Sequence, residues 1–461
     1  MCSIRFYRQY GLSHRSRPEW ILISEVDDAT VSWVAECLLI TNPDEGGENV
    51  NQDKLYVGID VSSKNNVCYL MHSDGSKHSS FSVPNNRNGA KLIVDRVTSV
   101  LLLQEIPQVV IGMEATSVYG DNLMRFLRES GSLGRFERSL HMLNPKQVKK
   151  FRDAYSDLPK NDFVDSFVIA DHLRFGRINK EVYMDDYKYQ ALKMYTRARH
   201  QLVQELTREK QRFLNIVFIC FSGLTQEKIF SDKFGATSMA LIEEFSSLDE
   251  LAYMNIDELA DFIRKHGKNH FENPEEIAEA VQRAAKNSYR PPQVIAEAAK
   301  QMIAISMNTI RLLQKQIKEY DKAIEKMLET IPQTLTSVKG IGNVYAAGII
   351  AEIGDINRFP SQASLAKYAG LVWTQHQSSD FEAEDKRMIQ GGNHHLKYYL
   401  CEAANALRRC DPEVKRFYAL KYKETNKHNH KRALALTARK LVRLVYTLLK
   451  TNRLYIPPEE Y

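Results

Sequence analysis

Apolar and polar positions follow three successive patterns along this chain. From residue 54 to 185, short apolar runs of strand length alternate with amphipathic stretches of helical period. From 186 to 331, apolar residues recur at three- and four-residue steps over long distances, which is typical of long paired helices. From 332 to 455, shorter helical patterns follow one another. We therefore expect an α/β domain followed by an all-α region.

The first region begins with a meander of strands. Polar turns join three apolar runs, after which helical and strand patterns alternate. The predicted strands are 55–61, 67–71, 79–83, 108–113 and 139–143, and the predicted helices are 90–103, 119–129 and 162–174, with a further helix starting at Pro145. Three antiparallel strands followed by alternating α and β elements fit an RNase H-like layered fold.

The second region contains two long apolar repeats. They run from Leu192 to Ile216 and, as a stricter heptad, from Ile303 to Ile331. Such repeats predict two long helices that pair antiparallel as a coiled-coil stalk. Residues 221–290 lie between them and are expected to form small helices at the tip of the stalk.

The ends of the chain lie outside these patterns. Residues 1–53 have no clear period and end in the linker-like sequence N-P-D-E-G-G-E-N-V-N-Q-D. Two interpretations stay open for them. They form a disordered extension, or the start is mis-assigned, because E-G-G-E could be encoded by a purine-rich ribosome-binding sequence with Val50 as the first residue. Residues 456–461 form a short tail.

Composition excludes several protein classes. With 461 residues, 43% of them hydrophobic, the chain is too long for one core and is expected to form two or three domains. Charges interrupt its apolar runs well short of a membrane span, and its N-terminus lacks the layout of a signal peptide. Six scattered cysteines without a C-x-x-C pair argue against a disulfide framework or zinc ribbon. We expect a cytoplasmic protein with no membrane partner.

Positive charge is concentrated near the C-terminus. The net charge is only +6, but residues 408–453 contain fourteen Lys and Arg against three acids. This distribution favours a polyanionic partner, and the alternative is a solvated helical face. The best candidates for a nucleic-acid face on the last helices are Lys431, Arg432, Arg439, Lys440 and Arg443.

Four carboxylates occupy positions that an RNase H-like fold brings together. Asp60 lies within an apolar strand and Glu114 directly follows another, while Asp162 and Asp165 share one helix face. Hard divalent cations such as Mg²⁺ or Mn²⁺ prefer several oxygen ligands, and two of them support phosphoryl transfer. The alternative is that each acid is an ordinary edge or solvated residue. Asp171 is the nearest competitor and is expected to face solvent or a basic partner.

Two further motifs have both a functional and an ordinary interpretation. Gly340 and Gly342 form a G-x-G turn between apolar helices, with Lys339 before it and Lys367 after it. This turn could grip phosphate as in a helix-hairpin-helix motif, or it is a plain tight turn. Tyr398 and Tyr399 are expected to pack inside a helix, whereas the pairs His394-His395 and His428-x-His430 are expected to be solvated or to contact phosphate.

The loop Q-S-S-D contains adjacent Ser378 and Ser379. Ser, Asp, Gly and Asn are ordinary turn residues. A nucleophilic serine needs a base or a metal to activate it, and His376 does not sit at a diagnostic spacing. The residues alone therefore leave both serines as turn residues.

Six further stretches have a recognisable pattern: V-G-I-D-V-S-S-K, G-M-E-A-T-S-V-Y-G, L-N-P-K-Q-V-K-K-F, K-N-D-F-V-D-S-F-V-I-A, S-V-K-G-I-G-N-V-Y-A-A-G-I-I-A-E-I-G-D and A-L-T-A-R-K-L-V-R-L. Together they resemble one known family, the DEDD transposases of bacterial insertion sequences, which are relatives of the Piv-type DNA invertases. The resemblance covers residues 54–451 and departs from the family at Asn161, where Thr is common.

The resemblance implies roles for particular residues. It implies that Asp60, Glu114, Asp162 and Asp165 bind metal in a RuvC-like domain. The family carries Q-S-G and later G-N, which match Gln377-Ser378-Ser379 and Gly392-Asn393. Ser378 would then form a covalent phosphoserine link to DNA, and Asn393 would contact the nucleic acid. Ser379 replaces the usual glycine, so if that position needs a positive φ, the loop is strained or rearranged.

The resemblance also implies partners. They are donor and target DNA, a noncoding bridge RNA and further copies of the chain in a tetramer built as a dimer of dimers, with nucleoid association when DNA is bound. The preferred hypothesis is therefore a transposase or site-specific recombinase, an enzyme that cleaves and rejoins DNA strands. Two alternatives are a RuvC-like metal-dependent junction endonuclease without a serine nucleophile and a non-catalytic nucleic-acid-binding relic.

Overall fold

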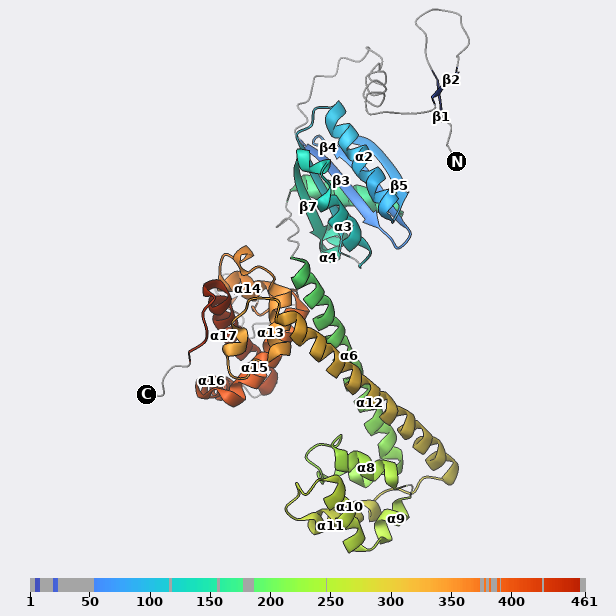
Figure 1. Cartoon of the computed structure of the whole chain (residues 1–461), viewed down its shortest axis with the longest axis vertical. Helices are drawn as coiled ribbons and strands as arrows, with labels where there is room; N and C mark the ends of the chain where they lie inside the picture. The colour runs from blue at the N-terminus through green and yellow to red at the C-terminus, as the bar shows by residue number, and fades with distance from the viewer. Residues whose placement is uncertain are drawn as a thin grey trace, which may run out of the picture. The chain divides into compact units, whose positions relative to one another are not determined.

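The computed structural model describes residues 54–115, 118–155, 158–176, 186–245, 247–373, 388–389, 391–424 and 427–456, and also the backbone of the strands Arg5–Arg8, Trp20–Ile23, Gln377–Ser378 and Phe381–Glu382. They belong to two compact units, residues 1–184 and 185–461 (Figure 1). Within residues 1–53, strands β1 (Arg5–Arg8) and β2 (Trp20–Ile23) pair antiparallel.

The first unit is built on a five-stranded mixed sheet. Its strands are β3 (Lys54–Val61), β4 (Asn65–His72), β5 (Lys77–Pro84), β6 (Gln108–Glu114) and β7 (Glu137–Leu143), in the order β5-β4-β3-β6-β7. β3, β4 and β5 form an antiparallel meander, and β6 and β7 run parallel to β3. The predicted meander and alternating elements are confirmed, and the strand order is consistent with the expected RNase H-like layout.

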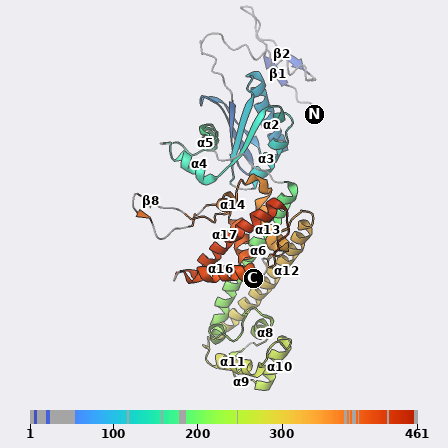
Figure 2. The ribbon, with the colours of Figure 1, turned by 90° about the vertical axis from the view of Figure 1, so that its left-hand side faces the viewer.

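Helices cover both faces of the sheet. α2 (Arg87–Leu103) and α3 (Tyr119–Glu129) lie on one face, and α5 (Asp162–Phe175), with α4 (Pro145–Arg152) packed on it, lies on the other (Figure 2). The alternation of side chains along β3 explains this division. Leu55, Val57 and Ile59 enter the core with α2 and α3, whereas Tyr56 packs with the residues of α5.

The second unit contains a long helical hairpin. Its arms are α6 (Tyr187–Cys220) and α12 (Gln293–Leu328). Lys188 at the start of α6 bonds the backbone oxygen of Thr330 just after α12, at 3.4 Å, and Cys220 at the end of α6 contacts Ala296 near the start of α12. The arms are therefore antiparallel, as predicted, while knobs-into-holes packing of a coiled coil stays a prediction.

Small helices join the two arms, as expected for residues 221–290. They are α7 (Ser222–Gln226), α8 (Ala236–Glu244), α9 (Leu248–Tyr253), α10 (Ile256–His266) and α11 (Pro274–Lys286). They share one hydrophobic core with the adjoining ends of α6 and α12, which includes Phe213, Leu251 and Ile303. This core fixes the tip to the hairpin.

The C-terminal part of the second unit is a helical domain. Its elements are the 3₁₀ turns η2 (Leu335–Ser337) and η3 (Ile356–Arg358) and the helices α13 (Asn343–Ile353), α14 (Gln362–Tyr368), α15 (His394–Cys410), α16 (Pro412–Lys423) and α17 (Asn429–Thr451). Its core includes Leu192 and Ile324 from the hairpin, so the domain and the base of the hairpin share a core. None of the described helices is long and apolar enough to cross a membrane.

The G-x-G turn differs in part from its prediction. Gly340 has a φ of +105°, and Gly342 is the N-cap of α13. The element before the turn is the short 3₁₀ turn η2 rather than a second apolar helix. Pro332 stands just after α12, and because proline cannot continue a helix, little chain is left there for another full helix.

Candidate active site

Two glycines allow α5 to lie directly against the sheet. Gly58 of β3 and Gly112 of β6 are neighbours in register. A Cβ atom on Gly58 would lie 2.2 Å from the backbone oxygen of Ser166, and one on Gly112 would lie 2.7 Å from Cδ2 of Leu173. Since real Cβ contacts are longer than this, any larger residue would push α5 away from the strands.

The same geometry gathers the four predicted acids. Asp60 and Glu114 each follow one of these glycines by two positions, so they project toward the face that α5 covers. Asp162 and Asp165 occupy the first turn of α5, which starts at the edge where β3 and β6 end. The side chain of Asn161 caps this helix by accepting a hydrogen bond from the amide of Val164 at 2.9 Å.

The acids are close enough to influence one another electrostatically. Burial, and then the charges of Asp165 and Asp162, raise the pKa of Asp60 to about 6. Burial, and then the charges of Asp60 and Asp165, raise the pKa of Glu114, while Arg152 opposes this shift. The structure therefore brings the four carboxylates into one electrostatically coupled group.

Arg152, the last residue of α4, takes part in this group. Its Nη1 forms an ion pair with Oδ1 of Asp165, and its Nη2 donates to the backbone oxygen of Pro159 at 3.2 Å. Among the described residues, no three His, Cys, Asp or Glu side chains converge closely enough to hold a metal ion as they stand. The ion pair of Arg152 with Asp165 was not predicted, because no local pattern links the two residues.

The environment of Asp171 agrees with one of the two expected alternatives and not with the other. It is almost fully buried, accepts a hydrogen bond from the hydroxyl of Tyr155 and pairs with Arg174 at 2.7 Å. The expectation of a basic partner is confirmed, and the alternative of a solvent-facing side chain is wrong. Its carboxylate is thus occupied within the unit.

Three lysines lie on α4, the helix that ends at Arg152, and the sequence pattern had not singled them out. Lys146, Lys149 and Lys150 of α4 are exposed, and the helix contains no acidic residue. In the described part of the chain, none of the three forms an ion pair. The signal was available in P-K-Q-V-K-K-F-R, where the apolar Val148 and Phe151 turn inward and leave the lysines outside.

The serine loop is described only in part. Ser378 belongs to strand β8 (Gln377–Ser378), which pairs antiparallel with β9 (Phe381–Glu382), and Ser378 stands opposite Phe381. Ser379 and His376 lie outside the described residues. The predicted role of Ser378 therefore stays a prediction.

The two ends of this loop meet in a narrow closure, which we call the neck (residues 368–373, 388–389 and 391–393). Trp373 and Met388 form an antiparallel bridge, and the amide of Ile389 donates to the oxygen of Val372 at 3.0 Å. The neck places the beginning and the end of the loop side by side.

Glycines allow the chain to pass closely at the neck. Gly370 and Gly392 have φ values of +71° and +104°, which favour glycine. A Cβ atom on Gly392 would lie 2.6 Å from the nitrogen of Gly370. The amide of Asn393 then donates to the oxygen of Tyr368 at 2.7 Å and completes the neck.

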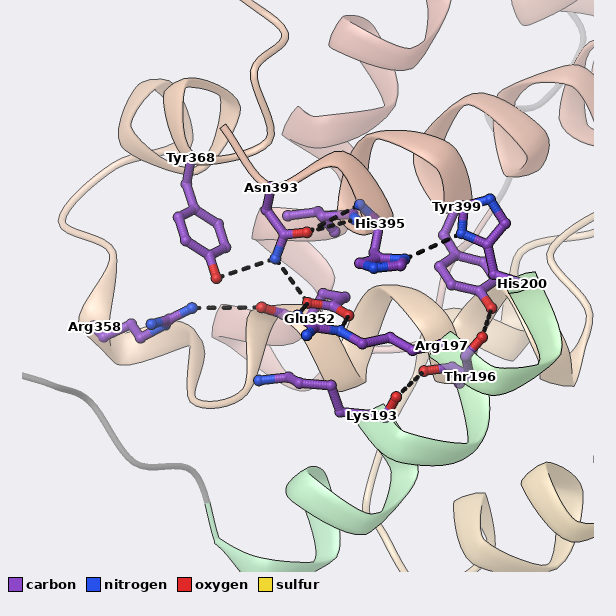
Figure 3. A network of polar contacts seen from close by, with 11 residues as sticks. Lys193, Thr196, Arg197, His200, Glu352, Arg358, Tyr368, Asn393, His395 and Tyr399 are labelled. Atoms are coloured by element: carbon purple, nitrogen blue, oxygen red, sulfur yellow. Dashed lines mark hydrogen bonds and ion pairs between the residues drawn. The ribbon is translucent and has the colours of Figure 1, made fainter. Parts of the chain in front are cut away.

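A buried carboxylate anchors this closure (Figure 3). Glu352 of α13 is fully buried and accepts hydrogen bonds from Nε and Nη2 of Arg197 at 2.7 and 2.9 Å. It also accepts one from Nδ2 of Asn393 at 2.7 Å. Asn393 uses its remaining amide hydrogen on the hydroxyl of Tyr368 and caps α15 with its oxygen. The predicted nucleic-acid contact of Asn393 stays untested, and its amide is occupied inside the domain.

The adjoining histidines differ from the expectation. Nδ1 of His395 lies 3.1 Å from Nδ1 of His200 on α6. Burial, and then the charges of Arg197 and His394, lower the pKa of His395 to about 4. The prediction of a solvated or phosphate-contacting residue is therefore wrong for His395, because α15 turns this side chain toward α6. The prediction that Tyr399 packs is confirmed, since it is fully buried and donates to the oxygen of Thr196 at 2.6 Å.

The other predicted nucleic-acid residues have varied surroundings. Lys339, Lys367, Lys431, Arg432 and Arg443 are exposed. Lys440 pairs with Glu413 at 2.5 Å and lies over the ring of Phe417. Arg439 is partly buried, and its Nη1 atom has no hydrogen-bond partner within the part of the chain that the structure describes. His430 bonds the hydroxyl of Tyr418 at 2.7 Å. Exposed positive charge thus remains on α17, and its partner is untested.

Comparison with known proteins identifies two family segments. Residues 57–221 match the DEDD transposase family of IS110, described as a transposase, and residues 332–419 match the family described as transposase IS116/IS110/IS902. The first segment contains the four acids, and the second contains Ser378 and the neck.

Two proteins of insertion elements are similar to this chain. The uncharacterized 43.6 kDa protein of insertion element IS110 from Streptomyces coelicolor is 29% identical over 150 residues, which are 32% of this chain and 36% of that protein. The uncharacterized 44.8 kDa protein of insertion element IS116 from Streptomyces clavuligerus is 22% identical over 412 residues, which are 89% of this chain and 98% of that protein. In both matched segments the chain is therefore similar to transposases of the IS110 and IS116 insertion elements.

Proposed function

We propose that this protein cuts and rejoins DNA strands for an insertion sequence, through one composite site made of the four acids and Ser378. The observation that carries the proposal is the coupled group of Asp60, Glu114, Asp162 and Asp165 at one edge of the sheet. A second observation supports it. The segment with Ser378 is closed at its base by the neck, which a backbone bridge and several hydrogen bonds hold together.

The chemistry of the donor set suits a divalent cation, but in the described structure no three of these side chains lie close enough together to hold one without rearrangement. The four carboxylates would hold Mg²⁺ or Mn²⁺, because hard cations prefer carboxylate oxygens. The raised pKa of Asp60 supports this fit, since it reflects negative charge that a cation would offset. When bound, the metal would stabilise the charge that develops on the oxygens of a phosphate under attack.

Ser378 supplies the nucleophile in this proposal. Its hydroxyl oxygen forms a bond to a DNA phosphorus atom, the bond from that phosphorus to a DNA oxygen breaks, and the serine proton is transferred to the leaving oxygen. Rejoining follows when the hydroxyl of a second strand attacks the phosphoserine and releases Ser378. Religation of this kind conserves the bond energy, so no further co-reactant is required.

The acids and Ser378 lie in different units of the chain. We therefore propose that the acids of one subunit can serve the serine of another, in a tetramer built as a dimer of dimers. Cutting would then depend on assembly, because a lone subunit would not need to contain a complete site. The hairpin of α6 and α12 is the proposed element of assembly.

Positive surfaces complete the proposal. Four carboxylates repel a polyanion, so nearby cations must attract the DNA backbone to them. Lys146, Lys149 and Lys150 lie on α4, whose last residue Arg152 pairs with Asp165, and they would hold the strand that is cut. Exposed cations of α17, together with Lys339 and Lys367, would bind donor or target DNA or the bridge RNA that the family resemblance implies.

A covalent trap tests this function. The full chain is incubated with nicked element-end DNA, Mg²⁺ and the RNA transcribed beside its gene, and adducts are separated by denaturing electrophoresis. The wild type and Ser379→Ala should form an adduct, whereas Ser378→Ala and Asp60→Asn should not. Normal cutting by Ser378→Ala would overturn the serine mechanism in favour of a junction endonuclease, and DNA left uncut by the wild type would favour a non-catalytic relic.

A further inference from the structure

We infer that Glu352 is a positioning residue for Ser378: its buried carboxylate, gripped by Arg197, binds Asn393 and so holds the neck of the serine segment closed. This inference rests on the proposed function, because it concerns the geometry of the serine reaction. Glu352 belongs neither to the group of four acids nor to the serine motif.

Glu352 is an unusual residue for the place it occupies. It lies on the apolar helix α13, where its neighbours Ile350, Ala351 and Ile353 form part of the core. Its side chain is completely buried, and burying an unpaired carboxylate costs several kcal/mol. A hydrophobic residue of similar size would fill this position at a lower desolvation free energy. We therefore infer that the charge has a role other than stabilising the fold.

Arg197 keeps this carboxylate charged. It approaches with two parallel hydrogen bonds, an arrangement that is strong and geometrically specific. Burial alone would raise the pKa of Glu352, but the hydrogen bonds and charge of Arg197, with Asn393, hold it below the ordinary value. The carboxylate therefore remains an acceptor for Asn393 throughout the physiological pH range.

Asn393 transmits this anchoring to the serine segment. Its side chain joins Glu352 to Tyr368, and its backbone amide binds the oxygen of Tyr368 (Figure 3). Tyr368 precedes the serine segment and Asn393 follows it, so one carboxylate fixes both of its ends. Arg197 belongs to α6, and the neck is consequently tied to the base of the hairpin rather than only to its own domain.

The substitution Glu352→Gln tests the inference in the full chain. It keeps the shape and one acceptor oxygen but removes the charge that holds Arg197. We expect the dissociation constant for element-end DNA to change less than about twofold and the rate of adduct formation to fall about tenfold to a hundredfold, as expected for a misplaced reacting group. Amide hydrogen exchange in residues 388–393 should accelerate, while exchange in α8 to α11 should not change.

Glu209→Gln is the matched control. Glu209 is also a buried glutamate, bonded to Ser306 at 2.5 Å and Arg212 at 2.8 Å, but it lies between the arms of the hairpin and does not contact the neck. It should leave the adduct rate and neck exchange at wild-type values. An equal loss in both variants would overturn the inference, because it would show a general effect of removing a buried charge.

A second variant covers the case in which Glu352→Gln does not fold. Asn393→Ser keeps a good N-cap for α15 but cannot reach Glu352, and it leaves the pair of Glu352 and Arg197 intact. The same loss of adduct rate, with the fold retained, supports the inference. Wild-type rates in Asn393→Ser, or in a folded Glu352→Gln, overturn it while the serine mechanism stands. Absence of an adduct in the wild type instead overturns the proposed function.

Discussion

Gly58 and Gly112 stand side by side on parallel strands β3 and β6, directly beneath α5. Each is followed two positions later by an acid, in G-I-D and G-M-E. The missing side chains bring the helix close, and the alternation of the strands turns Asp60 and Glu114 toward its first turn. The glycines thus determine how near the two groups of acids approach.

Replacement of Gly58 by alanine should therefore damage both stability and activity. The new Cβ would meet backbone atoms of Ser166 and Ala170, which cannot move without shifting α5. We expect the free energy of unfolding to fall by about 3 kcal/mol, at the upper end for overpacking. Urea denaturation of the full chain measures this loss, and DNA cleavage should fall with it because Asp162 and Asp165 move.

Gly131→Ala is the control for this substitution. No atom lies within 4 Å of the Cβ that it would add, and its φ is not in the left-handed region. Its free energy of unfolding should stay within about 0.5 kcal/mol of the wild type. A similarly small change for Gly58→Ala would show that α5 is not held at the strands in this way.

The sequence predicted the elements well because their patterns are local. The apolar run 55–61 became β3, Lys54–Val61, and the placement of Asp60 and Glu114 at strand ends followed from these runs. The antiparallel pairing of the two long helices likewise followed from their heptads. Periodicity shows which face of an element is apolar, and a fold then requires little further information.

The partners of individual charges were not predictable in the same way. In the sequence, Glu352 is a single charged residue within an apolar helical pattern, and its partner Arg197 lies 155 positions earlier in the chain. His395 was expected to be solvated because nothing local marks the approach of His200 from α6. Pairs of this kind depend on the packing of distant helices, which the spacing along one helix does not contain.

The substitution Asp60→Asn should stabilise the metal-free protein while it abolishes DNA cleavage. The pKa of Asp60 is raised from 3.8 to about 6, so the folded state binds this proton more tightly than the unfolded state. The metal-free wild type therefore loses stability as the pH rises from about 4 to 6 and stays destabilised above that range. After allowance for solvent screening, we expect a gain of about 1–2 kcal/mol at pH 7.5 for Asp60→Asn in a chelator.

Asp171→Asn should have the opposite effect on stability under the same conditions. Its carboxylate accepts from Tyr155 and pairs with Arg174, so the amide would weaken both contacts. Chemical denaturation with a metal chelator compares the two variants. A loss of stability for Asp60→Asn would contradict the view that its charge is uncompensated without metal.

Protonation of His395 should destabilise the second unit in mild acid. Its pKa is lowered to about 4, so the unfolded state binds the proton more readily. The stability that depends on neutral His395 is complete above about pH 6.5 and is lost as the pH falls toward 4. The charged groups around it are Arg197, His394, His200 and Glu352. The rings of His395 and His200 would repel each other when both are charged.

The variant His395→Gln should therefore flatten this part of the pH profile. We expect the wild type to lose about 1–3 kcal/mol of unfolding free energy between pH 6.5 and 4 from this residue, and the variant to lose correspondingly less. Urea denaturation at several pH values gives the profile. His270→Gln, at an exposed position of the tip, should keep the wild-type slope, and equal slopes in all three proteins would contradict the assignment.

Removal of two lysine charges on α4 should weaken DNA binding and its dependence on salt. Lys149 and Lys150 are exposed, have no ion pair among the described residues and lie on the helix that ends at Arg152, beside the acids. Each phosphate contact made by a lysine releases about 0.9 of a counterion from duplex DNA. The double variant Lys149→Gln/Lys150→Gln should lower the slope of log Kd against log salt by about 1.8.

The matched control Arg87→Gln/Lys91→Gln removes the same charge from α2, on the opposite face of the sheet, and should leave the slope within about 0.5 of the wild type. Fluorescence anisotropy with labelled element-end DNA measures both. Equal losses for the two pairs would mean that net charge alone, and not the α4 surface, attracts the DNA.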